Sequence, residues 1–143
     1  MPNLLFLDVN GVLICDRSAN FNPELMGNLK HITDNINLEI IVSSSWRSRE
    51  DLFGKLLEAL ERYEIPKPIG KTGKGPARAN LINAYCYNYC KERHLEMSEI
   101  KFVNLDDNVH LKEMMPENTI MTESRIGLNR EKADEVINLF KNE

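Results

Sequence analysis

The chain has 143 residues, of which 42% are hydrophobic, and a formal net charge of −4 at pH 7. This length and apolar content suit one domain over residues 1–143, with a buried core. Acidic and basic residues are mixed along the chain, which argues against the basic surface of a non-specific nucleic-acid binder. The three cysteines lack CxxC spacing and indicate neither a disulfide framework nor a zinc knuckle. No apolar run approaches the ~20 residues of a membrane span, so we expect an unprocessed, soluble, cytoplasmic protein without a membrane partner.

The first patterned segment, LLFLDVNGVLI at residues 4–14, allows two interpretations. Asn10 and Gly11 between apolar runs are typical of a two-residue β-hairpin turn. Alternatively, a buried strand ends here and delivers Asp8 to an active site. Residues 4–7 are continuously apolar rather than alternating, which is typical of a parallel strand buried on both faces. The pattern therefore favours the buried strand.

The rest of the chain alternates between helical and strand patterns. For example, Leu25, Leu29 and Ile32 recur at helical spacing, and Pro76 suits the first turn of a helix. Strands alternating with helices indicate an α/β fold, a doubly wound Rossmann-like parallel sheet with helices on both faces. Helices are predicted over residues 23–36, 49–63, 76–94, 110–115 and 130–140, and further strands over 38–42, around 68–70, 100–105 and 118–121.

Polar side chains follow the ends of several predicted strands. Asp8 follows the first, Ser43 to Ser45 follow the second, and Asp106 and Asp107 follow the strand over residues 100–105. A basic, glycine-containing loop, GKTGKGPAR, occupies residues 70–78. Because ligands of such sheets bind at the carboxyl ends of the strands, we expect these groups to form one polar cluster.

These residues resemble motifs of the haloacid dehalogenase (HAD) superfamily of aspartate-nucleophile phosphohydrolases. DVNGV at 8–12 resembles DxDGx, a serine follows the second strand, a Lys or Arg precedes a helix, and LDDN occupies 105–108. SSWR at 44–47, GKT at 70–72 and the late Thr122 with Gly127 and Leu128 resemble the HAD domains of Swiss Army Knife RNA repair proteins. The motifs keep their order over nearly the whole chain.

The spacing between these motifs leaves no room for a cap domain. In this superfamily a capless member has an open site, which implies access for a bulky phosphorylated substrate. An RNA or DNA end or a phosphoprotein is such a substrate. The resemblance therefore implies a phosphomonoester hydrolase that acts on an accessible phosphate group.

The resemblance also implies a metal centre and a nucleophile. Asp8 would attack phosphorus and form an aspartyl-phosphate, and Mg²⁺ would offset the charge of both partners. The metal ligands would be Asp8, Asp106, Asp107 and the backbone carbonyl of Asn10.

A second set of residues would bind the phosphate group. Ser44 and Ser45 are expected to hold its oxygens, and Ser44 is preferred to Ser43. A cation would cover the charge of the transferred group, and Lys74 is the first choice. The remaining candidates are Gly11, which lets the backbone turn beside the ligand, and the alternative cations Arg78 and Lys71.

Asn10 departs from the superfamily pattern, which has an aspartate there as general acid and base. An amide does not transfer a proton at useful cost, so we expect a loss of roughly 10²–10⁴-fold in rate. Three explanations stay open: a natural binding or slow-turnover variant, a deliberate Asp→Asn substitution, and another proton donor such as Asp16. The chain is then an impaired phosphatase or, alternatively, a non-catalytic module that binds phosphate or a partner.

Overall fold

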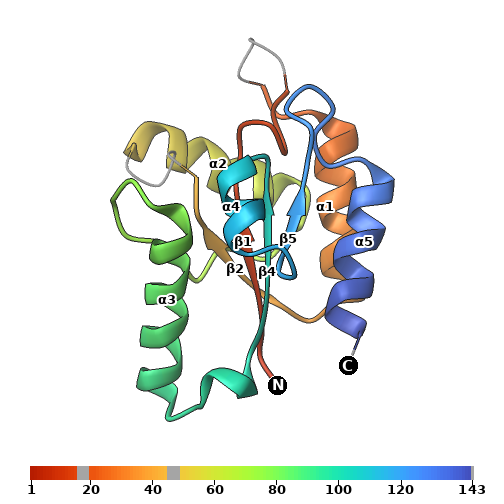
Figure 1. Ribbon diagram of the computed structural model, residues 1–143. Helices are drawn as coiled ribbons and strands as arrows, with labels where there is room; N and C mark the ends of the chain where they lie inside the picture. The colour runs from red at the N-terminus through yellow and green to blue at the C-terminus, as the bar shows by residue number, and fades with distance from the viewer. Residues whose placement is uncertain (16–19, 45–48, 143) are drawn as a thin grey trace.

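The computed structural model describes residues 1–15, 20–44 and 49–142. Five parallel strands form one sheet in the order β3-β2-β1-β4-β5. The first strand of the chain therefore lies at the centre of the sheet, as Figure 1 shows. This order reverses direction beside β1, the position at which doubly wound sheets bind their ligands.

The elements agree with the predicted ones to within about two residues at each end. The strands are β1 (Asn3–Leu7), β2 (Glu39–Val42), β3 (Gly70–Lys71), β4 (Lys101–Asp106) and β5 (Thr119–Met121). The helices are α1 (Pro23–Asn35), α2 (Glu50–Arg62), α3 (Arg78–Arg93), the 3-10 helix η2 (Met97–Glu99), α4 (Val109–Met114) and α5 (Arg130–Lys141). None of the helices in these described ranges has the length and apolar character needed to cross a membrane.

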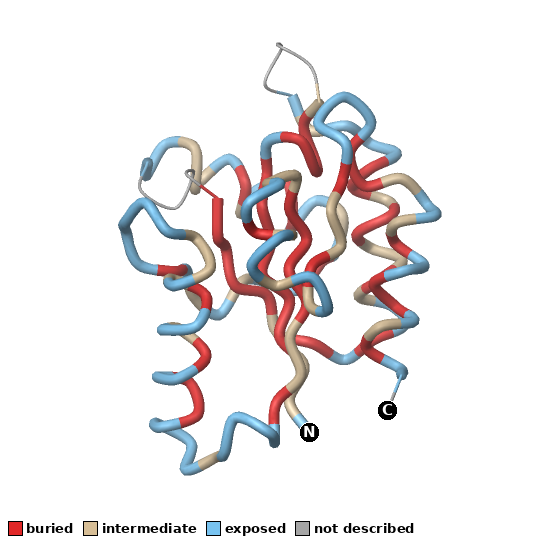
Figure 2. Tube along the Cα trace, viewed as in Figure 1, coloured by how far each residue is buried: buried red, intermediate tan, exposed pale blue. Residues whose placement is uncertain are grey.

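The central strand is buried on both faces, which explains its continuous apolar run. Leu4, Leu5, Phe6 and Leu7 are all 0% exposed. Leu5 and Leu7 pack in a cluster with residues of α1, α2 and α5, whereas Leu4 and Phe6 pack with residues of α3 and α4. Figure 2 shows the buried strands between their exposed helical surfaces. Since each such side chain contributes roughly 1.5–3 kcal/mol on burial, β1 is a rigid base for the residues that follow it.

The connections at the carboxyl edge of the sheet are short. Between β1 and β2 the described residues form a turn and α1, and between β2 and α3 they form α2 and β3. The described part of the chain thus contains no cap domain, as predicted. Asparagine caps fix where two helices begin near this edge: Asn22 accepts from the N–H of Glu24 at 2.9 Å, and Asn108 accepts from Leu111 at 3.0 Å.

Candidate active site

Asp8 lies directly after β1, and a tight turn follows it. The carbonyl of Val9 accepts hydrogen bonds from Val12, Leu13 and Ile14 at 2.8 to 3.2 Å. Gly11 adopts a φ of +82°, which favours glycine. Because β1 pairs in parallel with β2 and β4, Asn10 and Gly11 do not join two antiparallel strands, and the hairpin interpretation is wrong.

Three carboxylates meet at this edge of the sheet. Asp8, Asp106 and Asp107 each offer one ligand atom, and these atoms lie within 4.8 Å of one another. The register of the sheet brings the first two together, since Leu7 pairs with Leu105 and the N–H of Asp8 donates to the Leu105 carbonyl at 3.0 Å. Carboxylate oxygens at this spacing suit a hard divalent cation such as Mg²⁺.

Arg78, at the start of α3, bridges two of these acids. Its Nη1 donates to Oδ1 and Oδ2 of Asp106 at 2.9 and 2.8 Å, and lies 3.6 Å from Oδ2 of Asp8. The backbone N–H of Asn108 also donates to Oδ1 of Asp106, at 3.0 Å. A positive charge thus faces the acid that ends β1 and the acid that ends β4, where a phosphate group beside Asp8 would also meet it.

Burial and crowding perturb both acids. Burial, followed by the Asp106 carboxylate, raises the pKa of Asp8 from its ordinary value of 3.8 to about 8, although Arg78 opposes the rise. Burial also raises the pKa of Asp106, again against the effect of Arg78. One guanidinium therefore does not fully compensate the buried carboxylates, and a bound cation would remove the remaining electrostatic cost.

The connection between β5 and α5 orients the third acid. Ser124 Oγ donates to Oδ2 of Asp107 at 2.7 Å, and the buried Thr122 Oγ1 donates to the Gly11 carbonyl at 2.7 Å. A Cβ on Gly11 would lie 2.1 Å from Oδ2 of Asp107, so only glycine leaves room for this carboxylate. Ser124 was missed by the sequence analysis, and Thr122 entered it only as part of a late motif, because neither residue follows a recognisable pattern of metal-site partners.

The structure describes two of the three serines that follow β2. Ser43 and Ser44 are buried directly after β2. Ser45 and the alternative proton donor Asp16 lie outside the described residues. The roles predicted for Ser44 and Ser45 in phosphate binding stay predictions.

The other predicted polar residues are exposed. Asn10 is exposed on the turn after Asp8, and Lys74 is exposed in the loop before α3. Lys71 places its ammonium group 5.0 Å from the centre of the Phe53 ring. Arg78, the remaining predicted cation, contacts Asp8 and Asp106.

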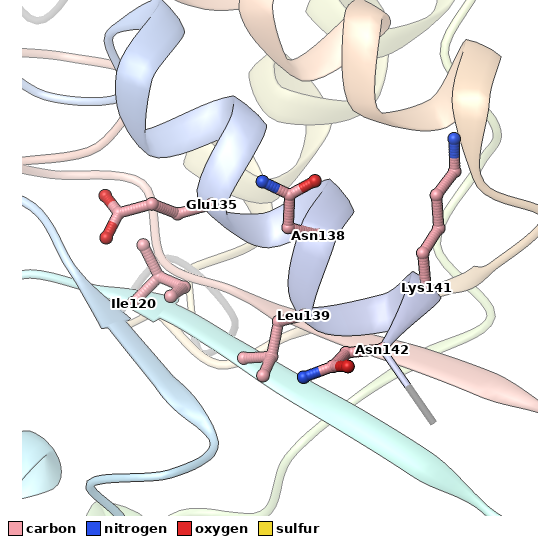
Figure 3. Close-up of a pocket in the computed structure, with 6 residues that line it drawn as sticks. All are labelled: Ile120, Glu135, Asn138, Leu139, Lys141 and Asn142. Atoms are coloured by element: carbon pink, nitrogen blue, oxygen red, sulfur yellow. The ribbon is translucent and has the colours of Figure 1, made fainter.

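Two cavities help to locate the site. A cavity of about 560 Å³, shown in Figure 3, lies between β5 and α5, and none of the three acids lines it. A second cavity of about 300 Å³ lies between the first turns of α3 and α4 and includes Arg78 and Asn108. Arg78 thus connects the second cavity with Asp8 and Asp106.

Comparison with known proteins agrees with this geometry. Residues 4–133 match the sequence model of a family described as the HAD domain in Swiss Army Knife RNA repair proteins. The match includes the turn after β1, the acids after β4 and the connection that contains Ser124. No curated protein matches the chain.

The raised pKa of Asp8 predicts a pH-dependent stability. Without divalent cations, the folded chain holds a proton on Asp8 up to about pH 8, whereas the unfolded chain releases it near pH 3.8. The free energy of unfolding should therefore fall as pH rises between these values. Asp8→Asn cannot ionise and should gain about 2 kcal/mol or more over the unmodified chain between pH 5 and pH 8. Urea unfolding across this range measures the difference. The exposed control Asp34→Asn should follow the unmodified chain, and an Asp8→Asn curve parallel to both would contradict the prediction.

The contact between Ser124 and Asp107 predicts a role in metal affinity. Ser124→Ala should weaken Mg²⁺ binding by about tenfold, because groups that orient metal ligands typically contribute 10–100-fold. Ser124→Thr should retain most of the affinity. Isothermal titration calorimetry with Mg²⁺ measures the change. The control Ser98→Ala changes an exposed serine in η2, remote from the acids, and should bind like the unmodified chain; equal affinity of Ser124→Ala and this control would exclude the role.

Proposed function

The chain belongs to the family of HAD domains of Swiss Army Knife RNA repair proteins, and on that premise we propose that it is a Mg²⁺-dependent phosphomonoester hydrolase. The observation that carries the proposal is the meeting of Asp8, Asp106 and Asp107 within 4.8 Å at the carboxyl edge of the sheet. The contacts of Arg78 with two of these acids add to it. Asp8 is the nucleophile because it ends the central strand and lies in the first motif.

The donor set fits a magnesium ion. Asp8, Asp106 and Asp107 supply carboxylate oxygens, and Asn10 keeps the backbone carbonyl that the family offers to the metal. When bound, the cation offsets the charges of the carboxylate and the phosphate group, so that the one can approach the other. Ser124 orients Asp107 for this role by a hydrogen bond, and Gly11 leaves the space that its carboxylate occupies.

The proposed reaction has two steps, formation and hydrolysis of the aspartyl-phosphate. In the first, a carboxylate oxygen of Asp8 bonds to phosphorus while the ester P–O bond breaks, and the leaving oxygen needs a proton. In the second, water attacks phosphorus, the aspartyl-phosphate bond breaks, and a base takes the proton of the water. Arg78 faces the phosphoryl oxygens in both steps. Asn10 supplies neither proton transfer, so solvent water gives the proton to the leaving oxygen and takes the proton of the attacking water, and turnover is slow in the present chain.

A phosphorylated nucleic-acid end is the substrate that the observations favour. The family is described by its occurrence in RNA repair proteins, and the described residues contain no cap domain over the acids. The net charge of −4 disfavours long contacts with a polynucleotide backbone. A terminal phosphate needs contacts only at the site itself. A phosphoprotein is the second substrate class.

A non-catalytic phosphate-binding module is the alternative function. It is favoured by one observation: position 10, which the family uses for proton transfer, holds an exposed amide. An amide at position 10 cannot transfer protons, but the acids and Arg78, which would bind metal and phosphate, are still present.

The replacement Asn10→Asp tests the proposal. It restores the missing acid and base and should raise hydrolysis of p-nitrophenyl phosphate with Mg²⁺ by roughly 10²-fold or more. The product p-nitrophenol is followed spectroscopically, and 5′- and 3′-phosphorylated oligonucleotides and a phosphopeptide are then compared by phosphate release. The matched control Asn88→Asp lies on the exposed surface of α3 and should not change the rate. Lack of activity in Asn10→Asp together with lack of Mg²⁺ binding would support the alternative module; high activity of the unmodified chain would show that Asn10 does not limit turnover.

Replacement of the basic residues identifies the catalytic cation. In the Asn10→Asp protein, Arg78→Ala should reduce kcat by about 10²-fold, because it leaves Asp106 and Asp8 without their charged partner and the phosphate group without a facing cation. Lys74→Ala should have a small effect, since Lys74 is exposed in the preceding loop. Steady-state rates of both variants, with circular dichroism as a check of folding, give the comparison. The opposite order of effects would assign the role to Lys74.

A further inference from the structure

The cavity of about 300 Å³ between the first turns of α3 and α4 has no role in the proposed reaction. One of its walls is formed by residues 76–80 at the start of α3, and the other includes Asn108, Leu111 and Met114 of α4 and its cap. Both helices begin at the carboxyl end of the sheet, as Figure 1 shows. Pockets that bind small molecules have volumes of roughly 300–1,000 Å³. The cavity therefore suits one small chemical group.

Residues of both walls contact the acids. Arg78 lines the cavity, and its Nη1 lies 3.6 Å from Oδ2 of Asp8 and 2.8 Å from Oδ2 of Asp106. On the other wall, the backbone N–H of Asn108 donates to Oδ1 of Asp106 at 3.0 Å. Under the proposed function, the phosphate group lies beside Asp8 and Arg78. The group esterified to that phosphate would then lie next to the cavity.

The hydrophobic core holds the two walls in place. Ile82 of α3 and Leu111 of α4 are buried in the cluster that contains Phe6 of β1. The side chain of Asn108 fixes the start of α4, because its Oδ1 accepts a hydrogen bond from the N–H of Leu111 at 3.0 Å. The cavity is thus formed before a ligand arrives, which lowers the entropy cost of binding.

The lining combines apolar surface with groups that recognise polar edges. Ala79, Leu111 and Met114 contribute apolar side chains, and Met114 is 67% exposed, so an apolar ligand can cover it. Asn80 and His110 add an amide and an imidazole, which both donate and accept hydrogen bonds. None of the described residues on the lining is acidic. The cavity therefore does not repel a ligand that carries a phosphate group.

These properties match a nucleobase better than the side chain of a phosphoprotein. A base has a flat aromatic face, which the thioether of Met114 can contact, and an edge with both donors and acceptors. Phosphoserine and phosphothreonine have no ring that could fill the cavity. The ring of phosphotyrosine has an aromatic face but no donors or acceptors for the amides. The lining thus favours a nucleotide.

We propose that this cavity binds the base of the terminal nucleotide when the terminal phosphate of an RNA or DNA end lies beside Asp8. The inference rests on the proposed function and deepens it, because it assigns recognition of the leaving nucleoside to residues of α3 and α4 outside the group of acids. Contact with one base suffices for this role. It is therefore compatible with the net charge of −4, which disfavours long contacts with a polynucleotide backbone.

Two phosphorylated trinucleotides test the cavity. In one, the phosphorylated residue carries a base, whereas in the other this residue is abasic but keeps its sugar and phosphate. Fluorescence polarisation with the unmodified chain and Mg²⁺ should give a Kd about tenfold lower for the trinucleotide with the terminal base, as expected for contact with one base. The comparison is made for 5′- and for 3′-phosphorylated ends, and the end that binds more tightly is used further.

Met114→Ala should reduce this preference for the terminal base to about twofold, because it removes the apolar contact with the base. Met114→Leu keeps an apolar side chain and should keep most of the preference. The matched control Met97→Ala makes the same change at an exposed methionine of η2, outside the cavity lining, and should keep the full preference. Because both methionines are exposed, we expect both alanine variants to fold, and their Tm values check this.

The outcomes distinguish the cavity from the proposed function. Equal affinities of the two trinucleotides for the unmodified chain would overturn the base-binding role, as would an unchanged preference in Met114→Ala. Tighter binding of a phosphotyrosine peptide than of either trinucleotide would also overturn it, in favour of the second substrate class. A preference that Met114→Ala removes, together with an Asn10→Asp protein that hydrolyses no phosphate ester, would support the cavity and overturn the hydrolase. Hydrolysis of both trinucleotides by Asn10→Asp with equal kcat/KM would do the reverse.

Discussion

Crowding of negative charge at one edge of the sheet is the constraint on which the rest of the structure depends. Asp8 and Asp106 are buried neighbours on adjacent strands, and Asp107 completes a group whose ligand atoms lie within 4.8 Å of one another. Burial, followed by repulsion from Asp106, raises the pKa of Asp8 to about 8. Such a group stays fully ionised in a folded protein at neutral pH only if cations accompany it. Arg78 is one such cation, and the oxygen donors provide for a second.

Burial of apolar side chains in the sheet interior offsets the electrostatic free-energy cost of the crowded acids. Four consecutive residues of β1 are fully buried between two layers of helices, so the strand that carries Asp8 has little freedom to relax away from its neighbours. The same edge holds Gly11 with a positive φ and the buried hydroxyls of Ser43 and Thr72, which have no hydrogen-bond partner in the described structure. Unfavourable groups thus concentrate where a ligand can compensate them, a common feature of functional sites.

The sequence predicts the parts of the fold that depend on local patterns. The apolar run before Asp8 indicates a buried strand without any knowledge of its neighbours, and the acids after β4 follow from the same argument. Lys74 and Arg78 belong to the same basic stretch in the sequence, and the choice of Lys74 as the phosphate-facing cation stays a prediction. The start of α3 is indicated locally by Pro76, but the contacts of Arg78 also depend on the face of the sheet that α3 covers, which the nearby sequence does not indicate.

Contacts between distant segments explain what the sequence does not reveal. Ser124 meets Asp107 across 17 positions, and Thr122 meets Gly11 across 111. Thr72, Ser43, Asp8 and Asp106 follow neighbouring strands, and they are brought side by side only by the register of these four strands. β3 has two residues, so its pattern is too short to predict pairing, and Thr72 belongs in sequence to a loop.

Asn10 separates two properties that an aspartate would combine. A carboxylate at position 10 transfers protons, but it also adds a negative charge on the exposed turn that follows Asp8. An amide lacks this charge and, under the proposed function, would repel an incoming phosphate dianion less, while the three acids and Arg78 are retained. Phosphate binding and phosphate turnover therefore make opposite demands on this position. Under the proposed function, a binding module and an efficient phosphatase would share the other residues of the site, and the side chain at position 10 would decide between them.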